Sequence, residues 1–146
     1  MNNLYQVSEL HPTDYNRGFL QLLEQLTVVD AQDITFDQFC EHHKKMTSRV
    51  YVIRDISLDK VVATGSVFIE HKFIHRLSSV GHIEDIVVHK DYRGLGLGRS
   101  IIDHLVKVAK DNNCYKVILD CNKDNVDFYK KCGFNEKEVE MALYFH

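Results

Sequence analysis

The sequence predicts one three-layer domain of the α/β or α+β class. Runs rich in β-branched residues alternate with helical patterns along the chain, an order that packs helices against a sheet. The chain has 146 residues, one proline and no Ser/Gly-rich linker, so we expect residues 1–146 to form a single domain. The clearest helix is Leu97 to Asp111, whose apolar side chains lie along one stripe.

The N-terminal third predicts one strand and two helices. Residues 5–10 have the composition of a short strand, and Asp14 to Leu26 has helical spacing with Asp14 as its cap. Thr35 with Gln38 three residues later is typical of a capping box, which predicts a second helix reaching about Lys45.

The middle of the chain predicts a β-hairpin. Val50–Ile53 and Val61–Ile69 are apolar and β-branched, and the polar segment DISLDK between them predicts a turn. HKFIHRLSS then separates this hairpin from a further strand-like run, GHIEDIVVH. After the Leu97 helix we expect a short buried strand at Lys116–Leu119, a helix at Lys123–Lys131 and a terminal strand at Val139–Phe145.

Charge and composition exclude several classes of function. The formal net charge is −3, so there is no general basic field for nucleic acid or an anionic membrane. No window has the apolar length of a membrane span, the N-terminus lacks a leader pattern, and the C-terminus ALYFH lacks the microbody tripeptide. The four cysteines lack CxxC pairing. We expect free thiols and a cytoplasmic protein, with a microbody or another organelle left open.

The segment YRGLGLG predicts an anion site. It connects the strand IEDIVV to the Leu97 helix, so backbone N–H groups gather at a positively polarised helix N-terminus. Gly94, Gly96 and Gly98 lack the Cβ atoms that would keep a phosphate from these amides, and Arg93 adds a charged donor. The alternative is a turn whose glycines only relieve strain. The spacing fits neither the Walker loop nor the dinucleotide fingerprint.

The spacing RGxGxG, after an acidic strand and before an amphipathic helix, resembles the coenzyme A loop of the GNAT superfamily of acyl-CoA-dependent N-acyltransferases. The stretches GHIEDIVV, CYKVILDCNKDNVDFYKKCGF and VEM resemble its members that acetylate a phosphorylated amino sugar, over residues 50–143 with weaker similarity in LTVVD and TFDQFCE. The resemblance implies a GNAT fold, a mixed, mostly antiparallel sheet with splayed central strands flanked by helices. It also implies acetyl-CoA as cosubstrate, a role in amino-sugar nucleotide supply, and a homodimer with shared active sites.

The resemblance also implies coenzyme-binding and catalytic residues. Glu84, Asp85 and Asp120 would orient and deprotonate the amine, and Tyr129 would stabilise the leaving thiolate. Neighbouring strand residues point to opposite faces, so Glu84 and Asp85 can share a site only if the strand bulges. An amide near Ile86 would meet the carbonyl oxygen. The coenzyme-binding positions are Asp85, Ile86, Val87, Val88, Arg93, Gly94, Leu95, Gly96, Leu97, Gly98, Arg99, Asn125 and Tyr129.

For the sugar phosphate, the resemblance implies a pocket of polar side chains. Its positions are Thr27, Lys72, His75, Glu84, Asp85, Tyr115, Lys116, Asp120 and Tyr144. At Tyr144 the family often has an arginine supplied by the partner subunit. A phenol cannot form the two-pronged charged contact of a guanidinium, so the phosphate would be held less strongly there.

Three alternatives remain open at this point. The chain could acetylate another small amine, or it could bind coenzyme A as a sensor module without catalysis. Cys121 could in principle accept an acetyl group, but no adjacent histidine supplies the base that it needs. We expect no catalytic metal, because His71 and His75 are four residues apart without an HExxH motif.

Overall fold

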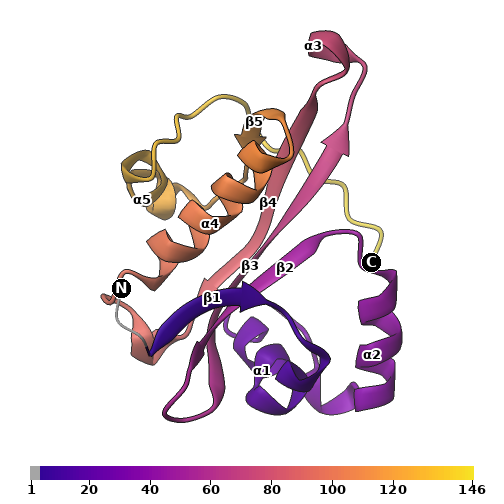
Figure 1. Cartoon of the computed structure of the whole chain (residues 1–146), viewed down its shortest axis with the longest axis vertical. Helices are drawn as coiled ribbons and strands as arrows, with labels where there is room; N and C mark the ends of the chain where they lie inside the picture. Colours follow the sequence, from indigo (N-terminus) through magenta and orange to yellow (C-terminus); the bar gives the residue numbers. More distant parts are fainter. Residues whose placement is uncertain (1–3) are drawn as a thin grey trace.

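The structure, a computed structural model, describes residues 4–146 and contains a five-stranded sheet in the order β1-β2-β3-β4-β5 (Figure 1). The first three residues of the predicted domain lie outside the described part. β1 to β4 pair antiparallel with their neighbours, and β4 pairs parallel with β5. The mixed, mostly antiparallel sheet is therefore confirmed.

Strands and helices alternate as the sequence predicts. The strands are β1 Tyr5–Glu9, β2 Arg49–Asp55, β3 Lys60–His71, β4 Ser79–Val88 and β5 Cys114–Ile118. The α-helices are α1 Phe19–Leu23, α2 Phe36–Lys45, α3 Ile74–Leu77, α4 Leu97–Asp111 and α5 Val126–Lys131. Short 3₁₀ helices are η1 Pro12–Arg17, η2 Ala31–Asp33, η3 Lys90–Tyr92 and η4 Lys123–Asn125.

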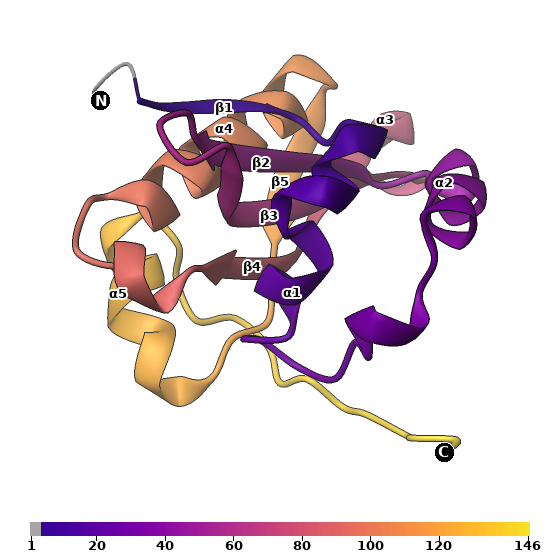
Figure 2. The same ribbon diagram turned by 90° about the horizontal axis from the view of Figure 1, so that it is seen from below.

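Helices cover both faces of the sheet, which gives three layers (Figure 2). On one face, α4 packs Ile101, Ile102 and Leu105, all fully buried, against the strands, and α5 adds partly buried side chains. On the other face, α1 and α2 form a second apolar cluster with Val52 and Val61. This arrangement follows from the amphipathic stripe of α4 and from the apolar side chains on both faces of β2 and β3.

The helix predicted from Asp14 to Leu26 is not continuous. Gly18 takes a left-handed conformation (φ 79°) and divides the segment into η1 and the short helix α1. The capping residue of η1 is His11, while Asp14 lies inside the element as the return partner of a capping box. Asp14 is fully buried, and Arg54 and Arg17 bind its carboxylate at 2.6 Å and 3.1 Å, which offsets the cost of removing its charge from water. The capping box of Thr35 and Gln38 at α2 is confirmed.

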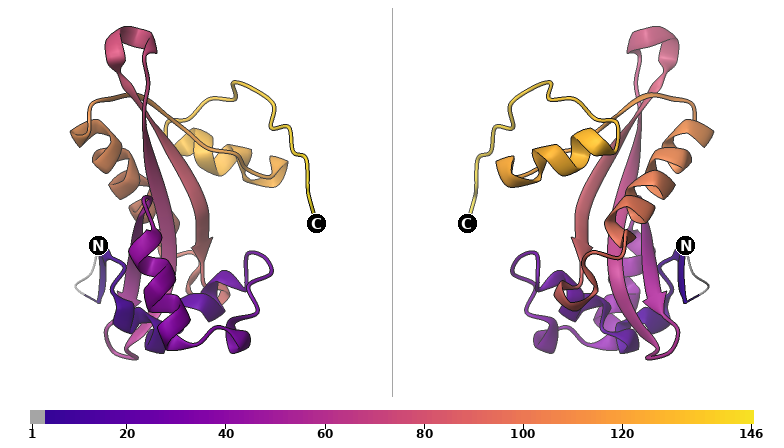
Figure 3. Two further views of the ribbon diagram at one scale, coloured as in Figure 1. Left: turned by 90° about the vertical axis from the view of Figure 1, so that its right-hand side faces the viewer. Right: turned by 90° about the vertical axis from the view of Figure 1, so that its left-hand side faces the viewer.

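Two C-terminal predictions are also wrong. β5 begins at Cys114 and is partly exposed rather than buried, because only β4 pairs with it and no strand among residues 4–146 covers its outer edge. The terminal strand predicted at Val139–Phe145 does not form; this segment extends away from the body (Figure 3). A strand needs a hydrogen-bonding neighbour, and the segment has none within the described chain. None of the helices in residues 4–146 is long and apolar enough to cross a membrane.

Candidate active site

The central strands separate midway along the sheet. β4 pairs with β5 only from Ser79 to His82, and the pairing ends there. From Ile83 to Val88, β4 has no strand partner on that edge among residues 4–146. The predicted splay is therefore present. It leaves a row of strand N–H and C=O groups to which an extended amide-containing ligand can bind as an additional strand.

A β-bulge lies on β4 where the strands separate. Ser66 pairs with Glu84 and Thr64 pairs with Val87, so Asp85 and Ile86 lie opposite the single residue Gly65. Asp85 takes a left-handed conformation (φ 54°), which is unusual for a residue other than glycine. The bulge that the pair Glu84 and Asp85 requires is thus confirmed.

The carboxylates at the bulge act on one another. The pKa of the Glu84 carboxyl is raised because the group is partly buried and because Asp85 and Asp120 add negative charge nearby. Asp120 lies just past the end of β5, on the other side of the splay. The structure therefore brings together the three predicted acidic residues. A carboxylate with a raised pKa is a better proton acceptor for an ammonium group than an ordinary one.

The glycine loop has the geometry of an anion cradle. Gly94 (φ 82°) and Gly96 (φ 78°) are left-handed, and a Cβ added at either would meet nothing within 4 Å. Residues 93–96 are exposed, and Gly96 caps the 15-residue helix α4, whose first amides have no helical acceptor. Gly98 has a different role, because a Cβ there would lie 3.2 Å from Phe128 of α5. This loop and the free β4 edge fit the pyrophosphate and the pantetheine arm of coenzyme A.

The loop is fixed to the rest of the domain from both sides. The hydroxyl of Tyr92 donates to the buried carboxylate of Asp55 at 2.5 Å, and this hydrogen bond raises the pKa of Tyr92 to about 12. Asp55 also accepts from the hydroxyl and the amide of Ser57. On the other side, the Lys90 amide donates to the side chain of Gln25 at 2.9 Å. The cradle is therefore held by side chains outside it.

Helix α5 brings Tyr129 to the same region. Burial and the nearby Cys121 and Cys132 raise the pKa of the Tyr129 phenol, so the hydroxyl stays protonated and can donate. Because Cys121 lies close enough to act on Tyr129 and follows β5 by a few residues, Tyr129 lies near the end of that strand. The predicted residue Asn125 is exposed at the N-terminus of α5.

Two of the predicted coenzyme positions, Val87 and Leu97, have buried side chains and so offer only backbone groups. The Val87 side chain is 6% exposed and belongs to the apolar cluster with α1 and α2, and the Leu97 side chain is buried in the core beneath α4. Arg99 donates to Asp103 at 3.0 Å and to the carbonyl of Lys131 at 3.0 Å, which links α4 to α5. Val88 packs at the edge of the core, while Leu95 is exposed.

The residues predicted for the sugar phosphate are only partly brought together. His75 stacks on Tyr115 with ring centroids 4.1 Å apart, and the Lys116 ammonium lies 5.6 Å from the centroid of the Tyr115 ring. Lys72 is 3.6 Å from Glu70, which also contacts His82 at 2.8 Å. Thr27 is exposed just beyond α1. Tyr144 is 85% exposed on the terminal segment.

Comparison with known proteins decides the family. Residues 8–134 match the profile of the "Acetyltransferase (GNAT) family". This chain belongs to the GNAT family. It is 44% identical over 144 residues to glucosamine 6-phosphate N-acetyltransferase of Candida albicans, covering 97% of this chain and 96% of that protein. It is 38% identical over 150 residues to the Arabidopsis thaliana enzyme of the same name, covering 99% of each chain.

Solved structures agree with this assignment. The crystal structure of glucosamine-6-phosphate N-acetyltransferase from Arabidopsis thaliana superposes with a TM-score of 0.94 at 37% identity, covering 97% of this chain and 99% of that one. An acetyltransferase from Trypanosoma brucei superposes with a TM-score of 0.84 at 30% identity, covering 97% and 99%. The GNAT fold and an acetyl-transferring activity are therefore established for this chain.

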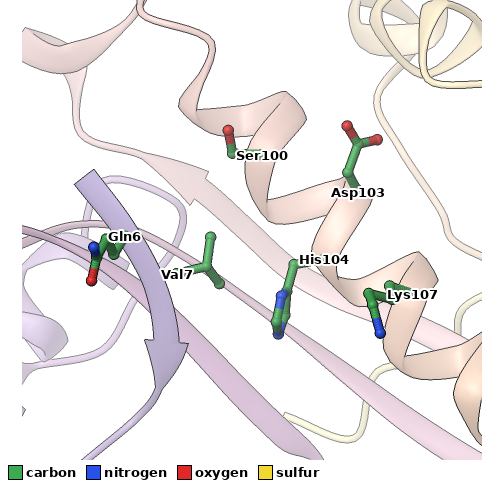
Figure 4. A pocket seen from close by; sticks show the side chains of 6 residues that line it. All are labelled: Gln6, Val7, Ser100, Asp103, His104 and Lys107. Atoms are coloured by element: carbon green, nitrogen blue, oxygen red, sulfur yellow. The ribbon is translucent and has the colours of Figure 1, made fainter. Parts of the chain in front are cut away.

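Two hollows accompany the GNAT site. A cavity of about 210 Å³ lies between α1, α2 and the bulge, with Asp85 and Ser66 among apolar side chains and His42 and His43 beside them. A shallower hollow of about 560 Å³ lies between β1 and α4 (Figure 4). None of the predicted site residues lines the second hollow; its Asp103 and Lys107 pair with Arg99 and Asp111.

Sequence reasoning missed several residues that build the site. Gly65, Asp55 and Gln25 each support the bulge or the glycine loop from elsewhere in the chain. A glycine inside a strand signals a bulge or a close approach, so Gly65 could have been recognised from the sequence. Asp55 and Gln25 act through partners 37 and 65 residues away, and no local pattern indicates them. No metal-binding group of three or more side chains occurs within the described chain.

Proposed function

We propose that this chain is a glucosamine 6-phosphate N-acetyltransferase that moves the acetyl group of acetyl-CoA directly to the sugar amine. The main support for this substrate is the sequence identity of 38–44%, over nearly the whole chain, to two enzymes with that name. The products are free coenzyme A and N-acetylglucosamine 6-phosphate, and the acetylated sugar would serve amino-sugar nucleotide synthesis. Glu84, Asp85, Asp120 and Tyr129 would supply the groups that this transfer needs, and the raised pKa values of Glu84 and Tyr129 support those roles.

The chain would hold acetyl-CoA through backbone groups. The amides from Arg93 to Arg99 would bind the pyrophosphate, and the free edge of β4 after His82 would pair with the pantetheine amides. Acetyl-CoA supplies an activated thioester carbonyl. The bulge leaves the Ile86 amide out of the β3 ladder, so this amide can donate to the carbonyl oxygen as negative charge develops there.

The acidic residues would prepare the amine. An ammonium group is not a nucleophile, so a proton must leave the sugar nitrogen before the carbon–nitrogen bond forms. Glu84, with its raised pKa, is the acceptor that best suits this transfer, while Asp85 and Asp120 would orient the amine. As the carbon–sulfur bond breaks, the Tyr129 hydroxyl would donate to the departing thiolate.

The sugar phosphate would bind the cations near the start of β5. His75, Tyr115 and Lys116 form one group of stacked rings and a cation, and Lys72 lies at the base of the same β3–β4 connection. Thr27 and Tyr144 would add hydroxyl contacts, Tyr144 in an assembled dimer. Because a phenol carries no charge, Lys116 and Lys72 would supply most of the attraction for the phosphate.

A thiol-release assay with a set of amines tests the proposal. We expect turnover with acetyl-CoA and glucosamine 6-phosphate, and at least tenfold lower kcat/KM with glucosamine, which lacks the phosphate. Lys116→Ala should reduce kcat/KM for the phosphorylated sugar and change it little for glucosamine; Lys110→Ala, at the solvent face of α4, is the control. Turnover of another amine alone, or coenzyme binding without turnover of any amine, would refute the substrate assignment.

We further propose that a second copy of the chain covers the terminal segment. Five apolar or aromatic side chains there are 80–89% exposed, which a lone chain would not tolerate in water. They are Val139, Met141, Leu143, Tyr144 and Phe145. Light scattering should give the mass of a dimer, and Leu143→Glu should shift it toward the monomer. Leu58→Glu, in the exposed turn after β2, should leave the dimer intact. A monomeric wild-type chain would contradict this part.

A further inference from the structure

Gly65 lies where three side chains converge. A Cβ at this residue would come 2.4 Å from Cδ1 of Ile86, 2.7 Å from Cγ2 of Ile101 and 3.0 Å from Cδ1 of Leu105. Such approaches are too short for real carbon atoms, so glycine is required by packing and not by backbone angles. The missing Cβ leaves the space that the Ile86 side chain occupies.

The residue opposite Gly65 is the bulge itself. Two residues, Asp85 and Ile86, lie against this one position of β3, and their side chains are found on different sides of the sheet. Ile86 packs against the cluster beneath α4, whereas Asp85 lines the cavity beside α1 and α2. The left-handed backbone of Asp85 is strained, and such strain persists only where the surroundings hold it.

Two contacts hold the bulge to β3. One is the hydrogen bond from the Ser66 hydroxyl to the carbonyl of Glu84, at 3.2 Å. The other is the insertion of Ile86 over Gly65, against fully buried Ile101 and Leu105. We propose that Gly65 is a positioning residue of the acetyl-transfer site, because its missing side chain lets Ile86 anchor the bulge that places Glu84, Asp85 and the Ile86 amide. The expected effect of Gly65 on turnover rests on the proposed function, whereas its effect on the position of the bulge does not.

The packing indicates where the strain of an added methyl would go. Ile101 and Leu105 are 0% exposed in the middle of α4 and cannot move without disturbing the core. Ile86 is only partly buried and belongs to a segment outside the β3 ladder. Gly65→Ala would therefore displace Ile86 and the bulge with it. Ile86→Val removes the Cδ1 atom at 2.4 Å and so relieves the conflict with the bulge, while the contact with Cγ2 of Ile101 at 2.7 Å remains as a cost in stability.

Gly81 offers a matched control on β4, the strand that carries the bulge. A Cβ at Gly81 would lie 3.0 Å from the Cβ of Ala109 in α4, within the paired part of β4 and β5. Gly81→Ala should thus lower stability through the same helix without moving the bulge. Ile86→Ala is the complementary variant, because it removes the anchor without adding a clash and so remains informative if Gly65→Ala does not fold.

The experiment combines amide NMR with steady-state kinetics. We expect Gly65→Ala and Ile86→Ala to shift the amide resonances of Asp85 and Ile86 and to lower kcat at least tenfold, with KM for the amine changed less than threefold. Gly65→Ala/Ile86→Val should recover most of the amide shifts and of kcat, although its melting temperature stays low because the contact with Ile101 remains. Gly81→Ala should change neither the bulge resonances nor kcat while it lowers the melting temperature. Equal kinetic losses in Gly65→Ala and Gly81→Ala, or unchanged bulge resonances in Ile86→Ala, would overturn the proposal. The NMR arm holds even if no amine is acetylated.

Discussion

Gly96 and Gly18 allow backbone strain to be separated from ligand binding. Gly96 has φ 78° and ψ 13°, Gly18 has φ 79° and ψ 23°, and each precedes a helix as its N-cap. An added Cβ would meet nothing within 4 Å at either site. Replacement of each glycine by alanine therefore has the same cost in the free protein, but only Gly96 lies in the proposed pyrophosphate loop.

The cost can be worked out from the backbone conformation. Alanine in the left-handed region costs about 1–2 kcal/mol, and the stiffer unfolded chain returns about 0.4–1 kcal/mol. The net loss is up to about 1.6 kcal/mol, or up to about 6 °C in melting temperature for a domain of this size. Both variants should show this shift to within about 0.5 kcal/mol, since the backbone angles are alike and neither added methyl group meets an atom within 4 Å.

Calorimetric titration with coenzyme A then distinguishes the two variants. Gly18→Ala should bind as the wild type does. Gly96→Ala should bind at least tenfold more weakly, which corresponds to about 1.4 kcal/mol, because its methyl group lies in the space open to the pyrophosphate and its backbone prefers other angles. Equal affinity for the two variants, at equal stability, would refute the role given to the glycine loop.

Three further predictions concern buried charge and catalysis. Asp14→Asn should lower the free energy of unfolding at pH 7 by about 2–3 kcal/mol in chemical denaturation, less than for a fully enclosed pair, because Arg17 and Arg54 reach solvent. Burial raises the pKa of Asp14, but the hydrogen bonds and charge of Arg54, together with hydrogen bonds from the His11 amide and Arg17, outweigh it, so the net pKa is lowered. The ion pairs of Asp14 therefore stabilise the protein above about pH 4, and this stabilisation is lost as pH falls below that. Asp59→Asn, on an exposed carboxylate, should change the free energy of unfolding little. If the difference in stability between the wild type and Asp14→Asn did not change with pH, this reasoning would be contradicted. Tyr129→Phe should reduce kcat at least tenfold in steady-state kinetics with little change in coenzyme affinity. The control Tyr15→Phe, which loses a hydrogen bond to the Ile34 carbonyl, should affect stability only. Equal losses of turnover and affinity in Tyr129→Phe would exclude the leaving-group role. Glu84→Gln should lower kcat/KM and abolish the fall in kcat/KM at low pH, which we attribute to protonation of Glu84 at its raised pKa. Glu41→Gln on α2 should keep this fall at low pH. If the fall persisted in Glu84→Gln, another group would accept the proton.

Caps and apolar periodicity correctly predicted two of the helices. The capping box of Thr35 and the apolar stripe of α4 place both helices at the residues expected, because caps and periodicity act within a few residues. The break at Gly18 was missed, since apolar spacing alone does not reveal a left-handed residue. The terminal segment was wrongly predicted to be a strand of this sheet. Alternating apolar residues indicate that a face will be buried, but they do not show whether the same chain or another one buries it.

The site was predictable to the extent that its motif is contiguous. The glycine loop, the acidic pair at the bulge and Tyr129 all follow from short stretches that resemble the family, and the structure brings the three acids together. Side-chain direction was not predictable in this way: Val87 points into the core and Arg99 binds Asp103. The supports of the site, Gly65 and Asp55, depend on contacts between distant strands and loops, which one sequence does not encode locally.

The most direct test of the account is calorimetric comparison of coenzyme A with pantetheine, which has the same amide arm but no diphosphate. If the amides before Ser100 hold the diphosphate, well-folded wild-type protein will bind coenzyme A saturably, one per chain, and bind pantetheine at least a hundredfold more weakly. Equal affinities, or no saturable binding of coenzyme A, would contradict the account.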